Sequence, residues 1–300
     1  MARFILSAFA DEAGDSLESQ IAALKENQIE YIEPRFIDKK NVITLTDEEL
    51  YAVRARLDEE EITVGSIGSP IGKYQIEEDF SLQLERLERA LRAAEILGAK
   101  RIRMFSFYIP RESRKEYLPE VARRLSVMVK LAEERGIKLC HENEEKIYGE
   151  SPEDVRDIFE SVDGLYGIFD PANYCVCGYD PELGLEVTLP RLEYVHIKDG
   201  KMKGSPGTEN GMIILPAGEG DGKIIEAIEK INESTSDSVI LTLEPHLFES
   251  DAFKGVDDRT LAADLKYANE REAFDAGVTA LKTLLANNGY ALINGVYEKV

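Results

Sequence analysis

The sequence contains few of the residues from which several common kinds of site are built. Three cysteines (Cys140, Cys175 and Cys177) and three histidines occur among 300 residues. An odd number of cysteines without paired spacings gives no disulfide framework, which indicates a reducing compartment. The Cys-x-Cys spacing at Cys175 and Cys177 could hold zinc, but no second pair completes four ligands. The thiols are therefore interpreted as structural or incidental.

Long hydrophobic runs and clusters of positive charge are also missing. No apolar run approaches the roughly 20 residues that span a bilayer, and the N-terminal stretch is too short and too soon acidic for a signal peptide. The 36 Lys and Arg residues are outnumbered by 58 Asp and Glu residues, which gives a formal net charge of -22. Because such a field repels phosphate backbones, we expect a cytoplasmic protein that binds neither a membrane nor a nucleic acid.

The hydrophobic content of 43% is enough for a substantial core. Short β-rich runs alternate with longer helical patterns from end to end, which predicts a single (β/α)8 TIM barrel over residues 1–300, with 288–300 as a C-terminal extension. The predicted strands are 3–9, 29–34, 62–67, 100–105, 137–142, 165–170, 192–196 and 238–244. The predicted helices include 16–27, 46–60, 79–97, 117–135, 152–159 and 223–232. Capping residues at Thr46 and Ser151 and glycines at Gly98 and Gly136 support these boundaries.

Each of the last four predicted strands is closed by a potential metal ligand, in the order Glu142, Asp170, His196 and Glu244. A charged group that closes an apolar strand is costly unless it points into a polar site. Because the carboxyl ends of all strands meet at one mouth of a barrel, the four side chains should converge there. Three carboxylates and one imidazole favour Mn²⁺ or Mg²⁺ and allow Co²⁺, Fe²⁺ or Zn²⁺. The alternative for each acid is an ion pair at the barrel rim.

Several other residues are predicted at the same mouth. Lys73 and Lys198 could bind substrate or be solvated charges, whereas Arg103 and Lys146 fit an ordinary surface pattern better. His246 lies two residues beyond Glu244 and could contact substrate or support a ligand.

The remaining candidates have stronger structural alternatives. Glu33 and Arg35 are expected to form an ion pair, and His141 should point toward the helices. Phe9 could form an apolar wall for a sugar or pack in the core. The loop 218–223 lacks the spacing of a phosphate-binding loop and is interpreted as a flexible segment before a helix, although Glu219 could reach metal-bound ligands through water.

Five short segments together resemble the xylose isomerase-like TIM barrels, and within them the sugar (phosphate) isomerase/epimerase group. They are Leu139–Asn143, Phe169–Asn173, Val195–Asp199, Gly218–Gly220 and Leu243–His246. The resemblance covers essentially the whole chain and implies that Glu142, Asp170, His196 and Glu244 bind one divalent metal. It also implies that Glu142 and Glu244 act as acid and base on opposite faces of a sugar. Chemically, a metal that chelates a carbonyl oxygen and the adjacent hydroxyl acidifies the neighbouring C–H and stabilises the resulting enediolate.

The sequence departs from this group at two positions. Many relatives have a histidine where this chain has Asn173, and many have one where it has Glu144. An amide can donate and accept hydrogen bonds but cannot exchange protons as an imidazole does, so Asn173 is predicted to bind substrate without catalysing.

Two other functions remain open. A lyase would use the same first step to dehydrate an inosose, a dehydroshikimate or a similar polyhydroxy ketone, and a metal-containing sugar-binding protein would not catalyse at all. The trinuclear zinc site of the apurinic endonucleases in this superfamily is not expected, because His141, His196 and His246 are too few. The shortage of basic residues disfavours a phosphorylated sugar. Relatives are commonly dimers or tetramers, so the tail 289–300 could cover a neighbouring copy or fold back on its own barrel.

Overall fold

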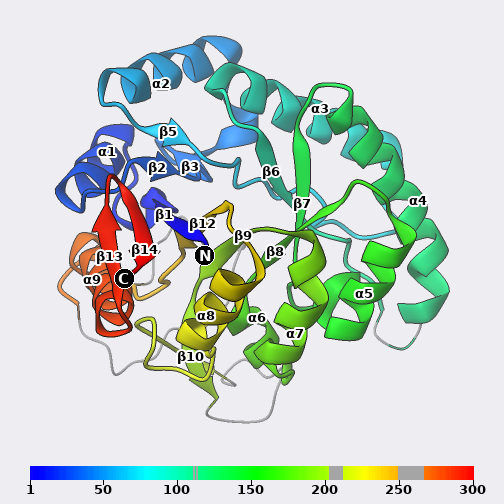
Figure 1. Cartoon of the computed structure of the whole chain (residues 1–300). Coiled ribbons are helices and arrows are strands. Elements are labelled where there is room, and N and C mark those ends of the chain that lie inside the picture. The colour runs from blue at the N-terminus through cyan, green and yellow to red at the C-terminus, as the bar shows by residue number, and fades with distance from the viewer. Residues whose placement is uncertain (111, 113, 203–211, 249–266) are drawn as a thin grey trace.

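The computed structural model describes residues 1–110, 112, 114–202, 212–248 and 267–300. Its centre is a curled sheet of eight parallel strands that closes into a barrel (Figure 1). In their order around the barrel, these strands are β1 (Arg3–Ala8), β2 (Tyr31–Ile32), β5 (Thr63–Val64), β6 (Arg101–Met104), β7 (Lys138–Glu142), β8 (Tyr166–Phe169), β9 (Leu192–Ile197) and β12 (Ser238–Leu243). A parallel bridge between Ile67 and Ile102 joins the β5 side to β6 and completes the ring.

Helices follow the strands and cover the outside of the barrel (Figure 1). They are α1 (Leu17–Glu26), α2 (Asp47–Glu59), α3 (Phe80–Leu97), α4 (Arg114–Glu133), α5 (Pro152–Ser161), α6 (Pro171–Cys177), α7 (Pro181–Thr188), α8 (Ile224–Ser234) and α9 (Glu270–Asn287). None of the helices in the described ranges is both long enough and apolar enough to cross a membrane.

The eight predicted strands and the predicted helices are confirmed to within a few residues. The capping signals act as expected: Thr46 and Ser151 each form a reciprocal capping box at the start of α2 and α5. Gly98 ends α3 with a φ of 77°, a left-handed conformation that glycine adopts without steric cost. Two short hairpins were not predicted. One pairs β3 (Phe36–Ile37) with β4 (Lys40–Asn41), and the other pairs β10 (Asp199–Met202) with β11 (Met212–Leu215).

The interior of the barrel is filled by alternate side chains of its strands. One cluster consists of strand residues alone: Cys140, Ile168, Tyr194 and Ile240 are buried, and the partly buried Ile5, Tyr31 and Tyr166 pack against them. Side chains of a strand return to the same face every second residue. Four titratable residues each lie two positions beyond a member of this cluster, and therefore on the same inner face: Glu33, Glu142, Asp170 and His196. The apolar interior thus continues directly into a layer of charged side chains at the carboxyl ends of the strands.

The C-terminal residues fold back on their own barrel. The hairpin of β13 (Tyr290–Ile293) and β14 (Val296–Lys299) joins the barrel sheet where Tyr297 pairs antiparallel with Phe4 of β1. Tyr290 and Tyr297 are buried, and the Tyr290 ring meets the Phe4 ring edge-on with centroids 5.6 Å apart. The hairpin therefore packs at the amino-terminal end of the barrel (Figure 1).

Candidate metal centre

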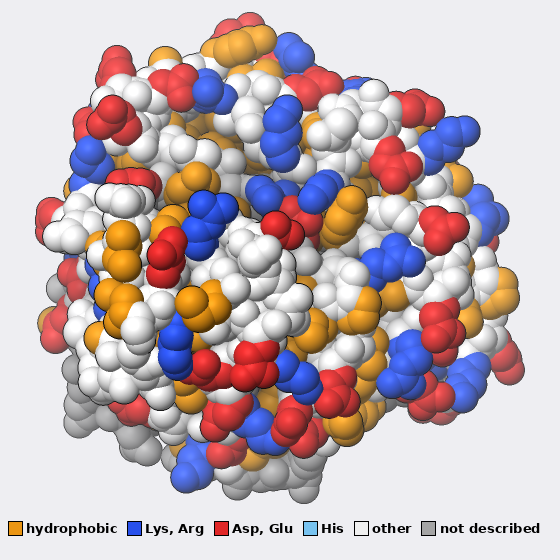
Figure 2. Space-filling model, in the orientation of Figure 1, with side chains coloured by type: hydrophobic (Ala, Val, Ile, Leu, Met, Phe, Trp, Pro, Cys, Tyr) orange, Lys and Arg blue, Asp and Glu red, His pale blue; other side chains and the backbone are white. Residues whose placement is uncertain are grey.

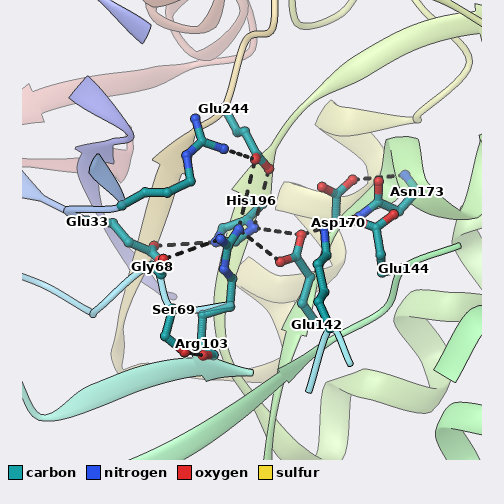
Figure 3. Close-up of polar contacts among 12 residues, drawn as sticks. Glu33, Gly68, Ser69, Arg103, Glu142, Glu144, Asp170, Asn173, His196 and Glu244 are labelled. Atoms are coloured by element: carbon teal, nitrogen blue, oxygen red, sulfur yellow. Dashed lines mark hydrogen bonds and ion pairs between the residues drawn. The ribbon is translucent and has the colours of Figure 1, made fainter. Parts of the chain in front are cut away.

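The four residues that close successive strands converge at the carboxyl end of the barrel. Glu142, Asp170, His196 and Glu244 are all buried, and each offers one ligand atom within 4.8 Å of the others. Figure 3 shows the side chains of Glu142, Asp170 and Glu244 arranged around His196. The predicted convergence is therefore present in the structure.

Glu142 ends β7 and is held by three different donors. One carboxylate oxygen, Oε1, lies 3.0 Å from His196 Nδ1 and accepts from the Asn173 side-chain amide at 3.3 Å. The other, Oε2, pairs with a guanidinium nitrogen of Arg103 at 3.3 Å. Burial opposes ionisation, but the charges of His196 and Arg103 outweigh it and lower the pKa of Glu142 to about 2. Glu142 is thus a carboxylate under ordinary conditions.

Asp170 is the N-cap of α6 and is fixed through its backbone and its side chain. Its Oδ1 accepts from the Asn173 backbone N–H at 3.0 Å, while the Asn143 amide bonds both its backbone N–H and its carbonyl. Its Oδ2 lies 2.8 Å from the Lys198 ammonium. Burial raises the pKa of Asp170 to about 6, although Lys198 acts in the opposite direction. The helix start therefore sets the position of this ligand.

His196 in β9 is the centre of the cluster and contacts acids through both ring nitrogens. Nδ1 lies 3.0 Å from Glu142 and 3.6 Å from Glu244, and Nε2 lies 3.3 Å from Glu33 Oε2. Glu33 also accepts from the Tyr194 hydroxyl at 2.8 Å. Burial disfavours the charged ring, but Glu142 and Glu33 raise the pKa of His196 to about 10. Glu33 thereby fixes the orientation of the ring and leaves Nδ1 facing the other three ligands.

Glu244 follows β12 and is held between two buried cations. Its Oε1 lies 2.9 Å from Arg35 and its Oε2 lies 3.2 Å from Lys198. Arg35 also pairs with Asp11 through Nε at 2.9 Å, so one guanidinium fixes two carboxylates. Burial opposes ionisation of Glu244, but Lys198 and His246 lower its pKa well below the usual range.

A second group of possible ligands, Glu12, Glu244 and His246, adjoins the first. The two ring nitrogens of His246 contact different acids, with Nδ1 3.1 Å from Glu12 and Nε2 3.3 Å from Glu244. The His246 backbone has a φ of 48° and donates its N–H to Glu12 at 2.7 Å. Arg35 already lies 3.4 Å from Glu12 and 2.9 Å from Glu244. Because Arg35 already contacts both carboxylates of the second group, we interpret this group as support for Glu244.

The donor set fits a divalent cation. At the mouth, the buried carboxylates outnumber the buried Arg and Lys side chains, with Asp11, Glu12, Glu33, Glu142, Asp170 and Glu244 against Arg35, Arg103 and Lys198. The raised pKa of His196 likewise shows that the cluster attracts positive charge. Carboxylate oxygens with one imidazole are ligands that suit Mg²⁺, Mn²⁺ and related ions. The cluster is therefore consistent with a divalent metal.

The predicted substrate-binding residues have different surroundings. Lys73 pairs with Glu144 at 2.9 Å and lies over the Phe105 ring, whereas Lys198 is buried between Asp170 and Glu244. Asn173 is buried against Glu142. These roles stay predictions.

Glu219 lies on the surface, and the glycine-rich loop around it has a structural role. The Asp199 carboxylate accepts N–H groups from Gly218 at 2.8 Å, Gly220 at 3.1 Å and Gly222 at 2.9 Å. The loop is therefore held by a buried side chain of β10 rather than shaped for phosphate. Whether Glu219 reaches the site through water stays a prediction.

Some expectations are revised by the packing. Glu33 and Arg35 were expected to pair, but Arg35 extends to Asp11 and Glu244 while Glu33 contacts His196 and Tyr194. Both residues lie in the segment after β2, outside the strand itself.

Other residues at this end follow the structural alternatives. Phe9 is fully buried, with the guanidinium groups of Arg35 and Arg103 over its ring and His196 at its edge, so its ring contacts residues of the candidate site. As predicted, His141 faces the helices and meets Phe159 of α5.

Sequence reasoning missed the supporting roles of Glu33, Asp11 and Glu12, and it underrated Arg103. The available signal was position: Glu33 directly follows the second strand, and Asp11 and Glu12 lie in a short helical turn after the first. Residues after those strand ends share the mouth with the four ligands. Parts of the irregular segments after β10 and β12, 203–211 and 249–266, lie outside the described residues.

A sequence profile described as xylose isomerase-like TIM barrel matches residues 21–271. The chain belongs to this family. The match covers most of the barrel and includes all four candidate ligands. None of the curated proteins compared with this sequence matches it.

Several solved structures have the same fold as this chain. A Mycobacterium smegmatis member, solved in complex with magnesium, is 17% identical with a TM-score of 0.66, and the alignment covers 95% of this chain and 97% of that one. The probable 3-DHS dehydratase AsbF of Bacillus anthracis is 16% identical with a TM-score of 0.66, covering 95% and 98%. The 3-keto-D-glucoside 4-epimerase YcjR of E. coli is 16% identical with a TM-score of 0.65, covering 95% and 100%.

Proposed function

We propose that this xylose isomerase-like protein is a metal-dependent sugar isomerase or epimerase that moves a proton next to the carbonyl of its substrate. The observation that carries the proposal is the placement of two ionised glutamates, from different strands, beside one ring nitrogen of His196. Glu142 and Glu244 come from strands that are separated by two others, and both reach His196 Nδ1 within 3.6 Å. They approach it from different sides (Figure 3). Proton removal and return on two faces of a substrate carbon needs such a pair.

The surrounding residues prepare both glutamates for this role. The low pKa of Glu142 and of Glu244 keeps each carboxylate deprotonated, which is the form required of a metal ligand and of a proton acceptor. Arg103 and Arg35 each hold one oxygen of the respective carboxylate. Holding a base in one orientation lowers the entropic cost of reaching the transition state. We assign Glu142 and Glu244 as the acid/base pair.

The proposed metal ligands are Glu142, Asp170, His196 and Glu244. A divalent cation bound there would supply Lewis-acid polarisation of the substrate carbonyl and stabilise negative charge on its oxygen. Glu33 orients His196 for binding, and Asn143 and Asn173 orient Asp170 through three hydrogen bonds of 2.9 to 3.0 Å. Mn²⁺ and Mg²⁺ fit the oxygen-rich set best.

The proposed substrate is an unphosphorylated polyhydroxy ketone or aldose. In the described part of the mouth, the cations are already paired with acids: Arg35 with Asp11, Arg103 with Glu142, Lys73 with Glu144 and Lys198 with Asp170. A phosphate would have to compete with these carboxylates for each cation. A neutral sugar can hydrogen-bond to the same side chains without displacing them.

Dehydration is the second candidate, and one observation favours it. The buried Lys198 ammonium, 2.8 Å from Asp170 and 3.2 Å from Glu244, is an acid beside the proposed base. After Glu142 or Glu244 has taken the proton from carbon, Lys198 could protonate a departing β-hydroxyl, which would leave as water. That the relatives of this fold include a probable dehydratase as well as an epimerase fits both outcomes.

Proton NMR in D₂O tests the proposal. The protein is reconstituted with Mg²⁺, which keeps the spectra sharp, and incubated with free ketoses, aldoses and inososes. We expect loss of the proton signal next to the carbonyl together with a new sugar isomer. A dehydrated product would assign the chain to the lyases. Metal and sugar binding without any exchange would instead support a binding protein and contradict the proposed catalysis.

A further inference from the structure

We propose that Arg103 contacts the substrate and stabilises the negative charge that forms on a substrate oxygen when a proton leaves carbon. This inference rests on the proposed function and adds a catalytic residue to it. Arg103 lies in β6 and also holds Glu142, with 3.3 Å between Nη1 and Oε2. That contact uses one of the five N–H groups that a guanidinium carries.

The two buried arginines at the mouth differ in how far their donors are used. Arg35 forms hydrogen bonds through all three of its nitrogens, to three carboxylates at 2.9 to 3.4 Å. Within the described residues, Arg103 forms two long hydrogen bonds, from Nη1 to Glu142 at 3.3 Å and from Nη2 to the Gly68 carbonyl at 3.5 Å. Its Nε–H has no acceptor there. Arg35 is thus fully engaged by the protein, whereas Arg103 retains donors.

Bulk water does not supply acceptors for these donors. Figure 2 shows many Lys and Arg side chains at the surface, where water completes their hydrogen bonds. Arg103 is buried, and a buried donor without an acceptor costs free energy. Its Nε is enclosed, so the terminal nitrogens are the ones that a ligand oxygen would meet. The unused donors therefore indicate a bound ligand at this place.

The terminal nitrogen Nη1 of Arg103 is close to both proposed acid/base residues. It lies 3.3 Å from Glu142 and 4.0 Å from Glu244. A base must come within about 3 Å of the group from which it removes a proton, so the reacting carbon has to lie near these carboxylates. Figure 3 shows Arg103 extending from its strand toward the centre of the cluster. Nη1 is therefore placed to reach an oxygen bonded to that carbon or to its neighbour.

Aromatic rings hold the guanidinium in this position. The central carbon of the guanidinium lies 4.9 Å from the centroid of the Phe9 ring and 5.1 Å from that of the Phe105 ring. Both rings are fully buried, and the Arg103 backbone N–H donates to Ile67 at 2.9 Å. An aromatic face attracts a cation without using its N–H groups. The side chain is thus positioned while its donors stay available to a ligand.

Proton abstraction from carbon produces the charge that these donors can stabilise. When a glutamate takes the proton, the C–H electron pair forms a C=C bond and the π electrons of the carbonyl move onto its oxygen. A fixed cation stabilises this oxygen more strongly in a buried site than in water. Arg103 donates hydrogen bonds and keeps its own protons, because a guanidinium does not deprotonate in proteins. When the proton returns to carbon, the carbonyl forms again and these hydrogen bonds weaken.

A conservative substitution of Arg103 tests this role through its kinetic signature. Arg103→Lys retains a positive charge but loses the planar fork of donors. Because the interaction strengthens in the transition state, we expect kcat to fall about 10-fold to 100-fold and KM to stay within about threefold. Arg101→Lys, the same change two residues earlier on β6, should leave both within about twofold. An unchanged kcat in Arg103→Lys, or a rise in KM alone, would overturn the proposal.

A binding measurement separates contact with the substrate from an indirect effect through Glu142. Threonohydroxamate, whose planar anion resembles an enediolate, and the neutral polyol threitol are titrated into Mn²⁺-loaded protein by calorimetry. We expect Arg103→Lys to weaken hydroxamate binding about 10-fold or more and threitol binding less than about twofold. Bound Mn²⁺ is the check on folding and on the metal ligands. Equal weakening of both ligands, or loss of Mn²⁺, would show that Arg103 only supports the site and would overturn the proposal.

The two measurements also separate this proposal from the proposed function. If the wild type exchanges no proton, the proposed function fails, and selective weakening of the hydroxamate would still show that Arg103 binds an anionic oxygen. If the wild type binds neither ligand, both proposals are overturned. If Arg103→Lys does not fold, Arg103→Gln, which keeps an amide donor without the charge, is measured in the same way and should show larger losses.

Discussion

The two ends of the barrel use similar residues in opposite ways. At the amino-terminal end, Arg101 of β6 pairs with Glu193 of β9 at 2.7 Å, with side chains 26% and 9% exposed. Two residues along β6, Arg103 pairs with Glu142 at 3.3 Å, with side chains 7% and 1% exposed. The first pair remains in contact with water at the barrel rim. The second lies among other buried charges.

This difference separates stability from function. A buried ion pair loses much of its Coulombic gain to desolvation, so a cluster of buried charges is poor support for a fold. Near the amino-terminal end, aromatic side chains instead pack on the outer face of β1, where Tyr290 and Tyr297 lie beside Phe4. The comparison teaches that the buried charges at the carboxyl end support the fold poorly and belong to the proposed metal centre, whereas the aromatic packing near the opposite end stabilises the barrel.

Removing a charge at the carboxyl end should have the largest effect. We expect Glu142→Gln to lower turnover by about 10³-fold or more, because a ligand and a proton-transfer group are lost together. Glu193→Gln makes the same change at the other end and should leave the turnover of the folded enzyme within about twofold. Product formation by NMR measures both, with circular dichroism as the check on folding. Equal losses of turnover in the two variants would contradict the proposed difference between the two ends of the barrel.

Truncating an aromatic residue at the amino-terminal end should affect stability instead. Tyr290→Ala removes a buried ring and should lower the free energy of unfolding by about 3 kcal/mol. Urea denaturation measures this change, and Mn²⁺ affinity should stay the same. Tyr51→Ala, at a residue that is 55% exposed, is the control and should change stability little. Loss of metal binding in Tyr290→Ala would mean that the two ends are not independent.

Replacing a residue that contacts a metal ligand, but not the metal itself, should have an intermediate effect. Glu33→Gln weakens the acceptor for His196 Nε2–H and should lower Mn²⁺ affinity about 10-fold to 100-fold. Titration calorimetry measures the affinity, with the exposed neighbour Glu30→Gln as the control. Unchanged affinity in Glu33→Gln would show that His196 does not depend on this acid for its orientation.

The smallest effect is expected at the outer part of the mouth. Lys73→Met keeps the apolar stem over Phe105 but removes the ammonium that pairs with Glu144. We expect KM to rise about fivefold and kcat to stay within about twofold, as for a group that binds ground state and transition state alike. Steady-state kinetics measures both, with the exposed Lys39→Met as the control. A fall in kcat without a change in KM would argue against substrate binding by Lys73.

Much of the fold could be predicted because local signals agree with the architecture. Thr46 and Ser151 begin helices through their side chains, Gly98 ends one through its backbone, and the inner face of each strand repeats every second residue. The convergence of Glu142 and Glu244 follows from parallel strands alone. The terminal hairpin could not be placed, since the sequence does not show whether a neutral β ribbon covers its own barrel or another copy.

The supporting residues of the site were harder to predict because their roles depend on side-chain reach. Glu33 and Arg35 are separated by one residue, but they contact different ligands. Glu33 contacts His196, whereas Arg35 contacts Glu244. Asp11 lies in a turn after β1, and its pairing with Arg35 joins segments 24 residues apart. Periodicity shows which face a residue occupies but not how far its charged group extends.

Metal stoichiometry tests the central claim most directly. Wild-type protein, Asp170→Ala and Glu193→Gln are each loaded with Mn²⁺, dialysed and measured for bound metal per chain. If the four ligands share one site, we expect one bound Mn²⁺ per chain in the wild type and in Glu193→Gln. We expect a large loss of bound Mn²⁺ in Asp170→Ala. The same metal content in Asp170→Ala as in the wild type, with both proteins folded, would contradict the metal centre.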